Sequence, residues 1–270
     1  MNVLSRLITP EFTPGTVWLV GAGPGDPGLL TLHAAHALTH ADVVLHDALV
    51  ASEVLALAPQ ARLERVGKRA GGERRAQLRI NQRLIRLARA GERVVRLKGG
   101  DPLLFGRGGE EALALAAAGV PFRIVPGISA GVGGAAAAGI PTTHRGLAQS
   151  VIFATGRGAT GEPDWETLAG AADVLVLYMA LRRFDSIEPR LRAGGRAADE
   201  PVAFISDATT PRQRVHVTTL ADAPAVAARI DRAAATLIVI GPVVGLRGPI
   251  AAAQLTASMM LAPAAQRATA

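Results

Sequence analysis

Two charged side chains flank a pair of glycines in the segment Lys98-Gly99-Gly100-Asp101. Glycine tolerates positive φ and leaves its backbone N–H and C=O groups open to a ligand, and the Asp101 carboxylate suits a ribose hydroxyl or an ammonium group. A second glycine run at 106–109 leads into Glu110 and Glu111, where acidic residues favour the start of a helix. The segment is typical of a ligand-binding loop, and a glycine-rich connector without a ligand is an equal alternative for one such loop.

A second glycine-rich loop, at residues 21–28, favours the ligand-binding interpretation. It follows the apolar residues 17–20 and precedes residues 29–32, with Asp26 as the expected N-cap and Pro27 at the first helical position. Asp26 stands where the dinucleotide fingerprint has its third glycine, and no Gly-Lys-Ser/Thr of a phosphate loop follows. The loop therefore indicates a nucleotide-type ligand that is neither NAD nor ATP.

Lysine is rare in this chain. Of 29 lysines and arginines only Lys68 and Lys98 are lysines, and each lies beside a glycine. A lysine can release a proton when its pKa is shifted, whereas an arginine effectively cannot. The two positions therefore indicate a specific need for an ammonium group, with chance survival of two lysines as the alternative.

The composition is that of a globular protein with a large core. The chain has 270 residues, of which 49% are hydrophobic, so it can form one large domain or two small ones. No run approaches the roughly 18 apolar residues that a membrane helix needs, and residues 1–14 are too polar for a signal peptide. Because cysteine is absent, we expect neither disulfides nor a thiolate metal site, and a cytoplasmic location.

The net charge of +7 predicts an acidic partner. Only six Phe, two Trp and one Tyr are present, which argues against nucleic acid as that partner. His33, His36 and His40 have the spacing of one helix face and could hold a metal, but no carboxylate or cysteine accompanies them. We expect a solvated helix face there and no metal site.

These loops require strands and helices to position them. Strands are expected at 17–20, 43–46, 63–66, 94–97 and 122–125, with a helix at 77–90 that ends at Gly91 and an alanine-glycine helix after residue 130. This alternation predicts a mostly parallel sheet in an α/β fold. Later strands at 151–154, 174–178, 202–205, 215–218 and 237–240 have fewer helices between them, which predicts a mixed sheet. We place one domain at 1–145, a second at 146–256, and a flexible tail at 257–270.

Several ordered motifs of the chain resemble those of the tetrapyrrole methylases. The resemblance spans nearly the whole chain and is carried by GAGPGDPGLLT (21–31), ADVVLHDALV (41–50), VGKRAG (66–71), RLKGGDPLLFGRGGEE (96–111), VPGISA (125–130), AGIPTTHRGLAQSV (138–151), Tyr178-Met179 and TTPRQRV (209–215). The ordered set is far more specific than one glycine loop.

The resemblance implies two α/β domains with S-adenosylmethionine bound in the cleft between them, usually in a homodimer and without a metal. Carried over by position, the cofactor contacts would be Pro24, Gly99, Gly100, Asp101, Leu104, Ser129, Ala130, Met179 and Ala208. Asp47, at a strand end, matches the family's proposed proton acceptor, and Lys68 matches its proposed proton donor.

Within this family the chain most resembles the methylases that act on uroporphyrinogen III. Such an enzyme would add methyl groups at carbons 2 and 7 and form precorrin-2 through precorrin-1, for sirohaem or cobalamin. The substrate carries eight carboxylates, which match an arginine-rich protein, and Arg107, Arg145, Arg157 and Arg214 lie in or beside motifs. His46, next to Asp47, replaces the tyrosine common in the family, so the chain departs from the family pattern at this point.

Two alternatives remain open. A later corrin-pathway methylase, such as a precorrin-4 C-methyltransferase, shares the GAGPGDP opening, although residues 46–50 and the VGKRAG segment favour the first assignment. The other alternative is a non-catalytic basic protein that binds an anionic ligand and does not depend on the cofactor.

Overall fold

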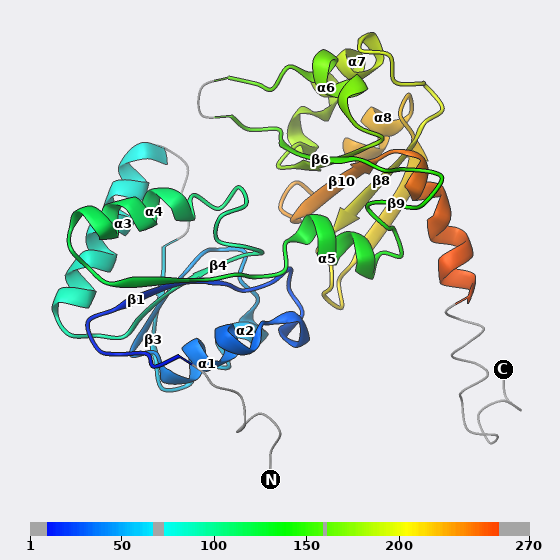
Figure 1. Cartoon of the computed structure of the whole chain (residues 1–270). Helices are drawn as coiled ribbons and strands as arrows, with labels where there is room; N and C mark the ends of the chain where they lie inside the picture. Colours follow the sequence, from blue (N-terminus) through cyan, green and yellow to red (C-terminus); the bar gives the residue numbers. More distant parts are fainter. Residues whose placement is uncertain (1–9, 67–72, 159–160, 254–270) are drawn as a thin grey trace, which may run out of the picture. The chain divides into compact units, whose positions relative to one another are not determined.

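The structure is a computed structural model that describes residues 10–66, 73–158 and 161–253 (Figure 1). The chain divides into two compact units, residues 1–130 and 131–270. The domain boundary expected after residue 145 stays a prediction, and the expected tail at 257–270 lies outside the described residues. No helix within the described ranges is both long and apolar enough to cross a membrane.

The first unit is built on a five-stranded sheet in which every pair of neighbouring strands is parallel. The strands are β1 (Val17–Gly21), β2 (Val43–His46), β3 (Arg62–Arg65), β4 (Val94–Lys98) and β5 (Phe122–Val125), in the order β3-β2-β4-β1-β5. The parallel sheet predicted for this half of the chain is confirmed.

Helices cover both faces of this sheet (Figure 1). The helices are α1 (Leu32–His40), α2 (Ser52–Leu55), α3 (Glu73–Arg89) and α4 (Gly108–Ala117). Alternate residues of β1 point to opposite faces: Trp18 packs with the core under α1 and α2, whereas Leu19 packs with the core under α3 and α4. Because both faces are covered, central strands such as β4 are buried at every position.

The helix start predicted at Pro27 is confirmed only for a short 3-10 helix. Asp26 does act as a cap, since its Oδ1 accepts a hydrogen bond from Gly28 N at 2.7 Å, but Pro27 begins only the short 3-10 turn η2 (Pro27–Leu29). Leu30 then adopts an extended backbone, which ends the turn. The true helix α1 begins at Leu32, with Thr31 as its N-cap.

The second unit has a mixed sheet, as predicted. Its strands are β6 (Val151–Thr155), β7 (Val174–Tyr178), β8 (Pro201–Ser206), β9 (Arg214–Thr219) and β10 (Thr236–Ile240), in the order β6-β7-β10-β8-β9. Only β6 and β7 pair in parallel within the described residues, and the remaining neighbours are antiparallel.

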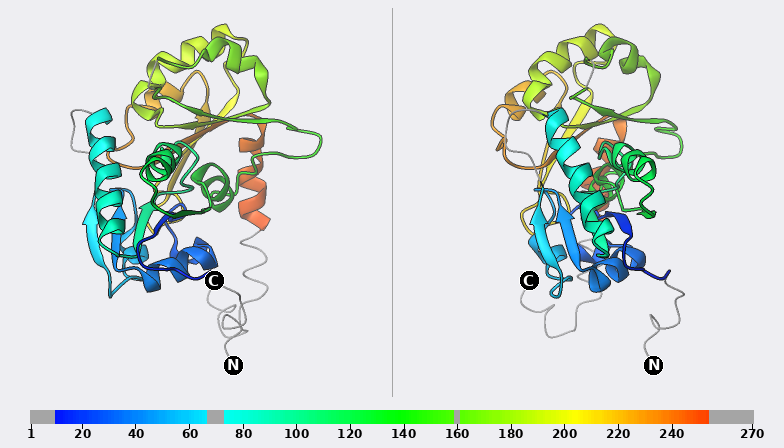
Figure 2. Two further views of the ribbon diagram at one scale, coloured as in Figure 1. Left: turned by 60° about the vertical axis from the view of Figure 1, so that its left-hand side comes forward. Right: turned by 90° about the vertical axis from the view of Figure 1, so that its left-hand side faces the viewer.

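The second sheet is also covered on both faces. One face carries α6 (Trp165–Ala171), α7 (Phe184–Ala193) and α8 (Ala223–Ala227), which pack through side chains such as Trp165 and Phe184. Both views of Figure 2 keep the yellow-green helices of this layer on one side of the strands. The other face packs against α5 (Ala130–Ala137) and the 3-10 turn η4 (Pro242–Leu246) through Ala135 and Val243.

Candidate functional site

Three glycine-containing loops cross where β1, β4 and β5 end. Gly23 N donates to Gly100 O at 3.2 Å, and Gly100 N donates to Gly23 O at 2.8 Å. A Cβ on Gly21 would lie 2.6 Å from Gly100 O, and a Cβ on Gly127 would collide with the same oxygen. Gly100 also has a φ of +67°, which a side chain rarely adopts. Glycine is therefore required at this crossing for packing as well as for backbone conformation.

The Asp101 carboxylate links two of these loops by hydrogen bonds. Its Oδ1 accepts from Leu103 N at 2.8 Å within its own loop, and its Oδ2 accepts from Gly127 N at 3.0 Å in the loop after β5. A Cβ on Gly100 would lie 3.6 Å from Ser129 Cα and 3.8 Å from Ala130 N. The structure thus brings four predicted cofactor residues together, and Pro24 follows directly on the Gly23–Gly100 bridge.

The surface at Gly99 is open. Gly99 is exposed, and a Cβ placed on it would have its nearest neighbour, Leu49 Cβ, 4.0 Å away. Leu49 belongs to the turn that follows Asp47, so this open backbone lies beside that turn. Leu104 is half-buried in the loop after Asp101.

The two remaining predicted cofactor residues, Met179 and Ala208, belong to the second unit. Met179 follows β7 with a φ of +54° and a side chain that is 48% exposed. Ala208 is 8% exposed and lies between Asp207 and Thr209, whose φ values are +47° and +66°. Non-glycine residues in this region cost about 1–3 kcal/mol and cluster at ligand sites. This backbone strain supports a binding role for both positions.

Asp47 follows β2 and contacts a buried arginine. Arg96 Nη2 donates to Asp47 Oδ1 at 2.5 Å, and Lys98 Nζ lies 4.0 Å from Asp47 Oδ2. Arg96 and Lys98 in turn pair with the buried Glu111, through Arg96 Nε to Oε1 at 3.0 Å and Lys98 Nζ to Oε2 at 3.1 Å. Burial and the charge of Arg96 lower the pKa of Lys98, and Glu111 and Asp47 partly offset them.

Sequence reasoning missed this ion network, because Glu111 was interpreted only as an acid at a helix start. A usable signal was present: Arg96 and Lys98 are two residues apart on a central strand, so both side chains point to one face. Two cations on a face covered by helices require nearby carboxylates. The other predicted catalytic residue, Lys68, lies outside the described residues.

The four arginine candidates for substrate binding have different surroundings. Arg107 pairs with Glu110 through Nη2 and Oε2 at 2.7 Å, and Arg214 Nη1 donates to Gln213 O at 3.1 Å. Arg145 and Arg157 are exposed.

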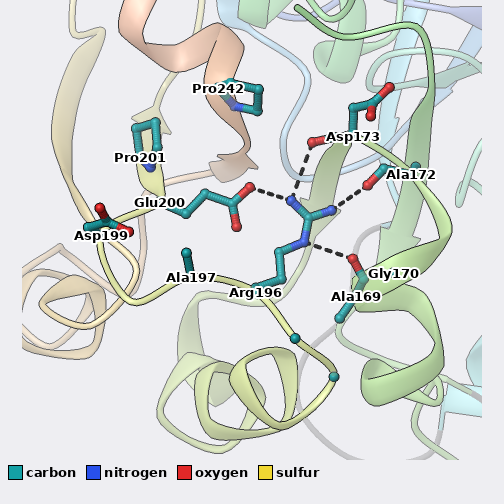
Figure 3. A pocket seen from close by; sticks show the side chains of 12 residues that line it. Ala169, Gly170, Ala172, Asp173, Arg196, Ala197, Asp199, Glu200, Pro201 and Pro242 are labelled. Atoms are coloured by element: carbon teal, nitrogen blue, oxygen red, sulfur yellow. Dashed lines mark hydrogen bonds and ion pairs between the residues drawn. The ribbon is translucent and has the colours of Figure 1, made fainter.

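A cavity of about 510 Å³ lies in the second unit, and none of the predicted site residues lines it (Figure 3). Its wall contains Arg196, whose guanidinium donates to the carbonyl oxygens of Ala169, Ala172 and Asp173 and to Glu200 Oε1 at 2.6 Å. Burial raises the pKa of Glu200, and Arg196 partly offsets this effect. Since the guanidinium is occupied by these contacts, the arrangement holds the end of α6 and is not suited to bind an anion.

The histidine face on α1 contains a run of neighbouring rings that are tilted against one another. The rings of His36 and His40 lie 4.2 Å apart, and the His36 ring lies 6.1 Å from Trp18. Burial and the neighbouring His40 lower the pKa of His36. Among the residues that the structure describes, no group of three or more histidines and acids could hold a metal ion.

Comparison with known proteins identifies the class to which this fold and these loops belong. The sequence profile described as Tetrapyrrole (Corrin/Porphyrin) Methylases matches residues 16–224. The chain therefore belongs to the tetrapyrrole methylase family.

Individual relatives narrow the comparison. The chain is 55% identical over 246 residues to a uroporphyrinogen-III C-methyltransferase of Sinorhizobium sp, covering 89% of this chain and 88% of that protein. It is 52% identical to a sirohaem synthase of Pseudomonas fluorescens, covering 88% of this chain but only 52% of that protein. The chain thus spans about half the length of the sirohaem synthases that it matches.

Two solved structures share the fold. A uroporphyrin-III C-methyl transferase of Thermus thermophilus complexed with S-adenyl homocysteine has a TM-score of 0.76 and 42% identity, covering 86% of this chain and 99% of that chain. A cobalt precorrin-4 methyltransferase also has a TM-score of 0.76 but only 28% identity, covering 88% of this chain and 99% of that chain. The predicted fold class, with its parallel first sheet and mixed second sheet, is confirmed.

Proposed function

We propose that this chain is a uroporphyrinogen-III C-methyltransferase that takes its methyl groups from S-adenosylmethionine. The observation that carries the proposal is the 55% identity to the Sinorhizobium uroporphyrinogen-III C-methyltransferase, nearly all of which the chain covers. The proposal concerns the methylation alone, because the chain spans only half of the sirohaem synthases.

The loop crossing fits an adenosyl ligand. Gly99 is open to a ligand, and the strand ends around Gly100, Ser129 and Ala130 offer backbone groups at one place. Asp101 already accepts two backbone N–H groups, and each carboxylate oxygen has a second lone pair with which to accept a ribose hydroxyl. Pro24, Gly99, Gly100, Asp101, Leu104, Ser129, Ala130, Met179 and Ala208 are the residues that we propose for the cofactor.

Methyl transfer demands alignment and the removal of one proton. S-adenosylmethionine, when bound, supplies an electrophilic methyl group on a positively charged sulfur. A pyrrole carbon of the substrate donates an electron pair to that methyl carbon as the carbon–sulfur bond breaks, which leaves S-adenosylhomocysteine and a positively charged ring. We propose that Asp47 takes the proton whose loss neutralises the ring, so that one proton leaves the substrate for each methyl group added. The role of proton donor that we propose for Lys68 is carried over from the resemblance and is not needed for this balance.

The remaining features of the proposal come from the resemblance. Methylation at carbons 2 and 7 would give precorrin-2 through precorrin-1, in a cytoplasmic homodimer. The eight carboxylates of the substrate need cationic partners, and a guanidinium on an exposed arginine such as Arg145 is suited to bidentate contacts with them.

A methylase of a later corrin step is the second candidate. It is favoured by the equal TM-score of 0.76 to the cobalt precorrin-4 methyltransferase. The lower identity of 28% to that enzyme, against 42% to the Thermus thermophilus enzyme, places it second.

The test is an anaerobic incubation of the purified chain with uroporphyrinogen III and S-adenosylmethionine, followed by the mass and absorbance of the tetrapyrrole. Two added methyl groups are the expected result. An unchanged tetrapyrrole, with S-adenosylmethionine still bound by calorimetry, would transfer the assignment to a later corrin methylase. Absence of cofactor binding would favour the non-catalytic basic protein.

A further inference from the structure

Four charged side chains form one cluster beneath the turn that carries Asp47. Arg96 and Lys98 come from β4 and Glu111 from α4, and their side chains are 2%, 2% and 0% exposed. Asp47 follows β2 and is 34% exposed, so it is the member that solvent or substrate can reach. The cluster contains two cations and two carboxylates, and burying a charge without its partner would be costly.

Every polar edge of Arg96 is engaged. Nε donates to Glu111 Oε1 at 3.0 Å, Nη1 donates to Leu97 O at 3.2 Å, and Nη2 donates to Asp47 Oδ1 at 2.5 Å. Glu111 is itself fixed, because Gln77 Nε2 donates to its Oε1 at 2.9 Å and Lys98 Nζ lies 3.1 Å from its Oε2. A planar guanidinium held on three sides cannot turn without losing a bond, so Asp47 Oδ1 meets a rigid donor.

The backbone of Asp47 is hydrogen-bonded to β4, the strand whose Arg96 also binds the Asp47 side chain. Asp47 N donates to Leu97 O at 3.2 Å, which continues the pairing of β2 with β4 in which His46 lies opposite Leu97. Side chain and main chain are therefore both tied to β4. With Oδ1 bound to Arg96, Oδ2 is left facing Lys98 Nζ at 4.0 Å.

We propose that the buried cluster of Arg96, Lys98 and Glu111 positions the Asp47 carboxylate and supplies the positive charge beside it, so that Oδ2 is presented to the proton that methylation releases. The inference rests on the proposed function. Arg96 and Lys98 are positioning residues, since they act on the reaction through Asp47. The Asp47 carboxylate thus has a support that is buried, rigid and part of the central sheet.

The same two strands provide a matched control at their other ends. Arg93 and Asp42 immediately precede β4 and β2, and Arg93 Nη2 lies 2.7 Å from Asp42 Oδ1. This pair is 35% and 38% exposed, so it has the chemistry of the Arg96–Asp47 pair without its burial. Arg93→Lys is therefore the control for the effect on these two strands of replacing a guanidinium, with its two parallel N–H donors, by an ammonium group.

The principal experiment compares Arg96→Lys with Arg93→Lys in the full chain. Lysine keeps the charge but loses the fork, so we expect single-turnover methylation of uroporphyrinogen III to fall about 100-fold in Arg96→Lys, as misplacement of a reacting group can cause. S-adenosylmethionine affinity by calorimetry should stay within about twofold in both variants, and Arg93→Lys should keep its rate. In an Asp47→Asn background, Arg96→Lys should cause no further loss, because both changes act on one group.

Lys98→Met serves if Arg96→Lys does not fold, as judged by circular dichroism. The charged or titratable groups around Asp47 are Arg96 and Lys98 of β4, His46 of β2 and Glu111 of α4, and Lys98 also acts on Glu110 of α4. Removing the Lys98 cation while Arg96 keeps its bonds should slow single-turnover methylation and leave S-adenosylmethionine affinity within about twofold of wild type, because Asp47 Oδ2 then lacks the positive charge beside it.

The outcomes separate the two proposals. If the wild-type chain does not methylate uroporphyrinogen III, both the proposed function and this inference are wrong. An active wild type in which Arg96→Lys matches Arg93→Lys overturns the inference alone, as does an equal loss from Arg96→Lys in the wild-type and Asp47→Asn backgrounds. An unchanged methylation rate in Lys98→Met has the same consequence.

Discussion

Individual residues with a strained backbone lie at or near three of the nine predicted cofactor positions, Leu104, Met179 and Ala208. Among the described residues, the non-glycine residues with positive φ are Phe105, Arg107, Met179, Asp207 and Thr209. Each is a predicted cofactor residue, or lies within three positions of one. Such strain persists only where the surrounding structure or a function requires it. The clustering is an argument for the cofactor residues that does not depend on the motif resemblance.

Asp47→Asn should separate catalysis from cofactor binding. The amide keeps the size of the side chain and can still accept the bond from Arg96, but it is a far weaker base. We expect the methylation rate to fall at least about 100-fold, in the range of general-base losses, with S-adenosylmethionine affinity within about twofold of wild type. Single-turnover rates and calorimetry provide the two numbers. A parallel loss of rate and affinity would contradict the assigned role.

Met179→Gly should weaken S-adenosylmethionine binding without lowering the stability of the fold by much. Glycine accepts a φ of +54° without the steric cost that methionine meets, and the lost side chain is 48% exposed. The free energy of unfolding should therefore stay within about 1 kcal/mol of wild type or rise, while S-adenosylmethionine affinity falls. Urea denaturation and calorimetry measure the two effects. Leu113→Ala, at a position 74% exposed on α4, is the control that should change neither. Unchanged affinity in Met179→Gly would mean that this side chain does not bind the cofactor.

At the scale of elements, the loop crossing depends on the absence of side chains. Gly127→Ala would push its Cβ into Gly100 O and to 2.7 Å from Gly21 Cα. Since both neighbours are backbone, no side chain can swing away, and we expect a loss of about 1–3 kcal/mol in the free energy of unfolding. The shift of the crossing should also weaken S-adenosylmethionine binding.

The matched control is Gly109→Ala on α4, where a Cβ would meet nothing within 4 Å. Alanine in a helix is favoured over glycine by about 0.5–1 kcal/mol, so this variant should unfold at a higher urea concentration and bind the cofactor normally. If Gly127→Ala behaved like Gly109→Ala, the crossing would not be the close-packed feature described.

Elements were predictable from the sequence where the pattern was local. β2, β5 and β7 have the predicted bounds, because apolar strands and their glycine breaks are read within a few residues. The start of α1 was misplaced, because Asp26-Pro27 is a good helix start locally and only the extended Leu30 ends the turn. The Asp47–Arg96–Glu111 contacts were not predictable in the same way, since they join residues 49 and 15 positions apart across the sheet.

At the scale of the whole molecule, each unit has its own core and one of the two tryptophans. Trp18 is 3% exposed in the first unit, and Trp165 is buried completely in the second. Trp18→Phe and Trp165→Phe variants therefore give fluorescence probes that follow the unfolding of one unit at a time. This matters because a chain of two units need not unfold in a single transition.

The buried carboxyl of Glu200 predicts how the stability of the second unit depends on pH. Burial raises the pKa of Glu200 above its ordinary value of 4.5, with Arg196 as a partial offset. A group whose folded pKa is raised stabilises the fold below its unfolded pKa, and that contribution is lost as the pH rises through the folded pKa. Glu200→Gln has no such titration. The difference in unfolding free energy, wild type minus Glu200→Gln, should therefore be largest below about pH 4.5 and shrink at higher pH. Urea denaturation from pH 4 to 8, followed by Trp165 fluorescence in a Trp18→Phe background, measures it. A difference that grows with pH would show that the ion pair with Arg196 outweighs the burial of the carboxyl.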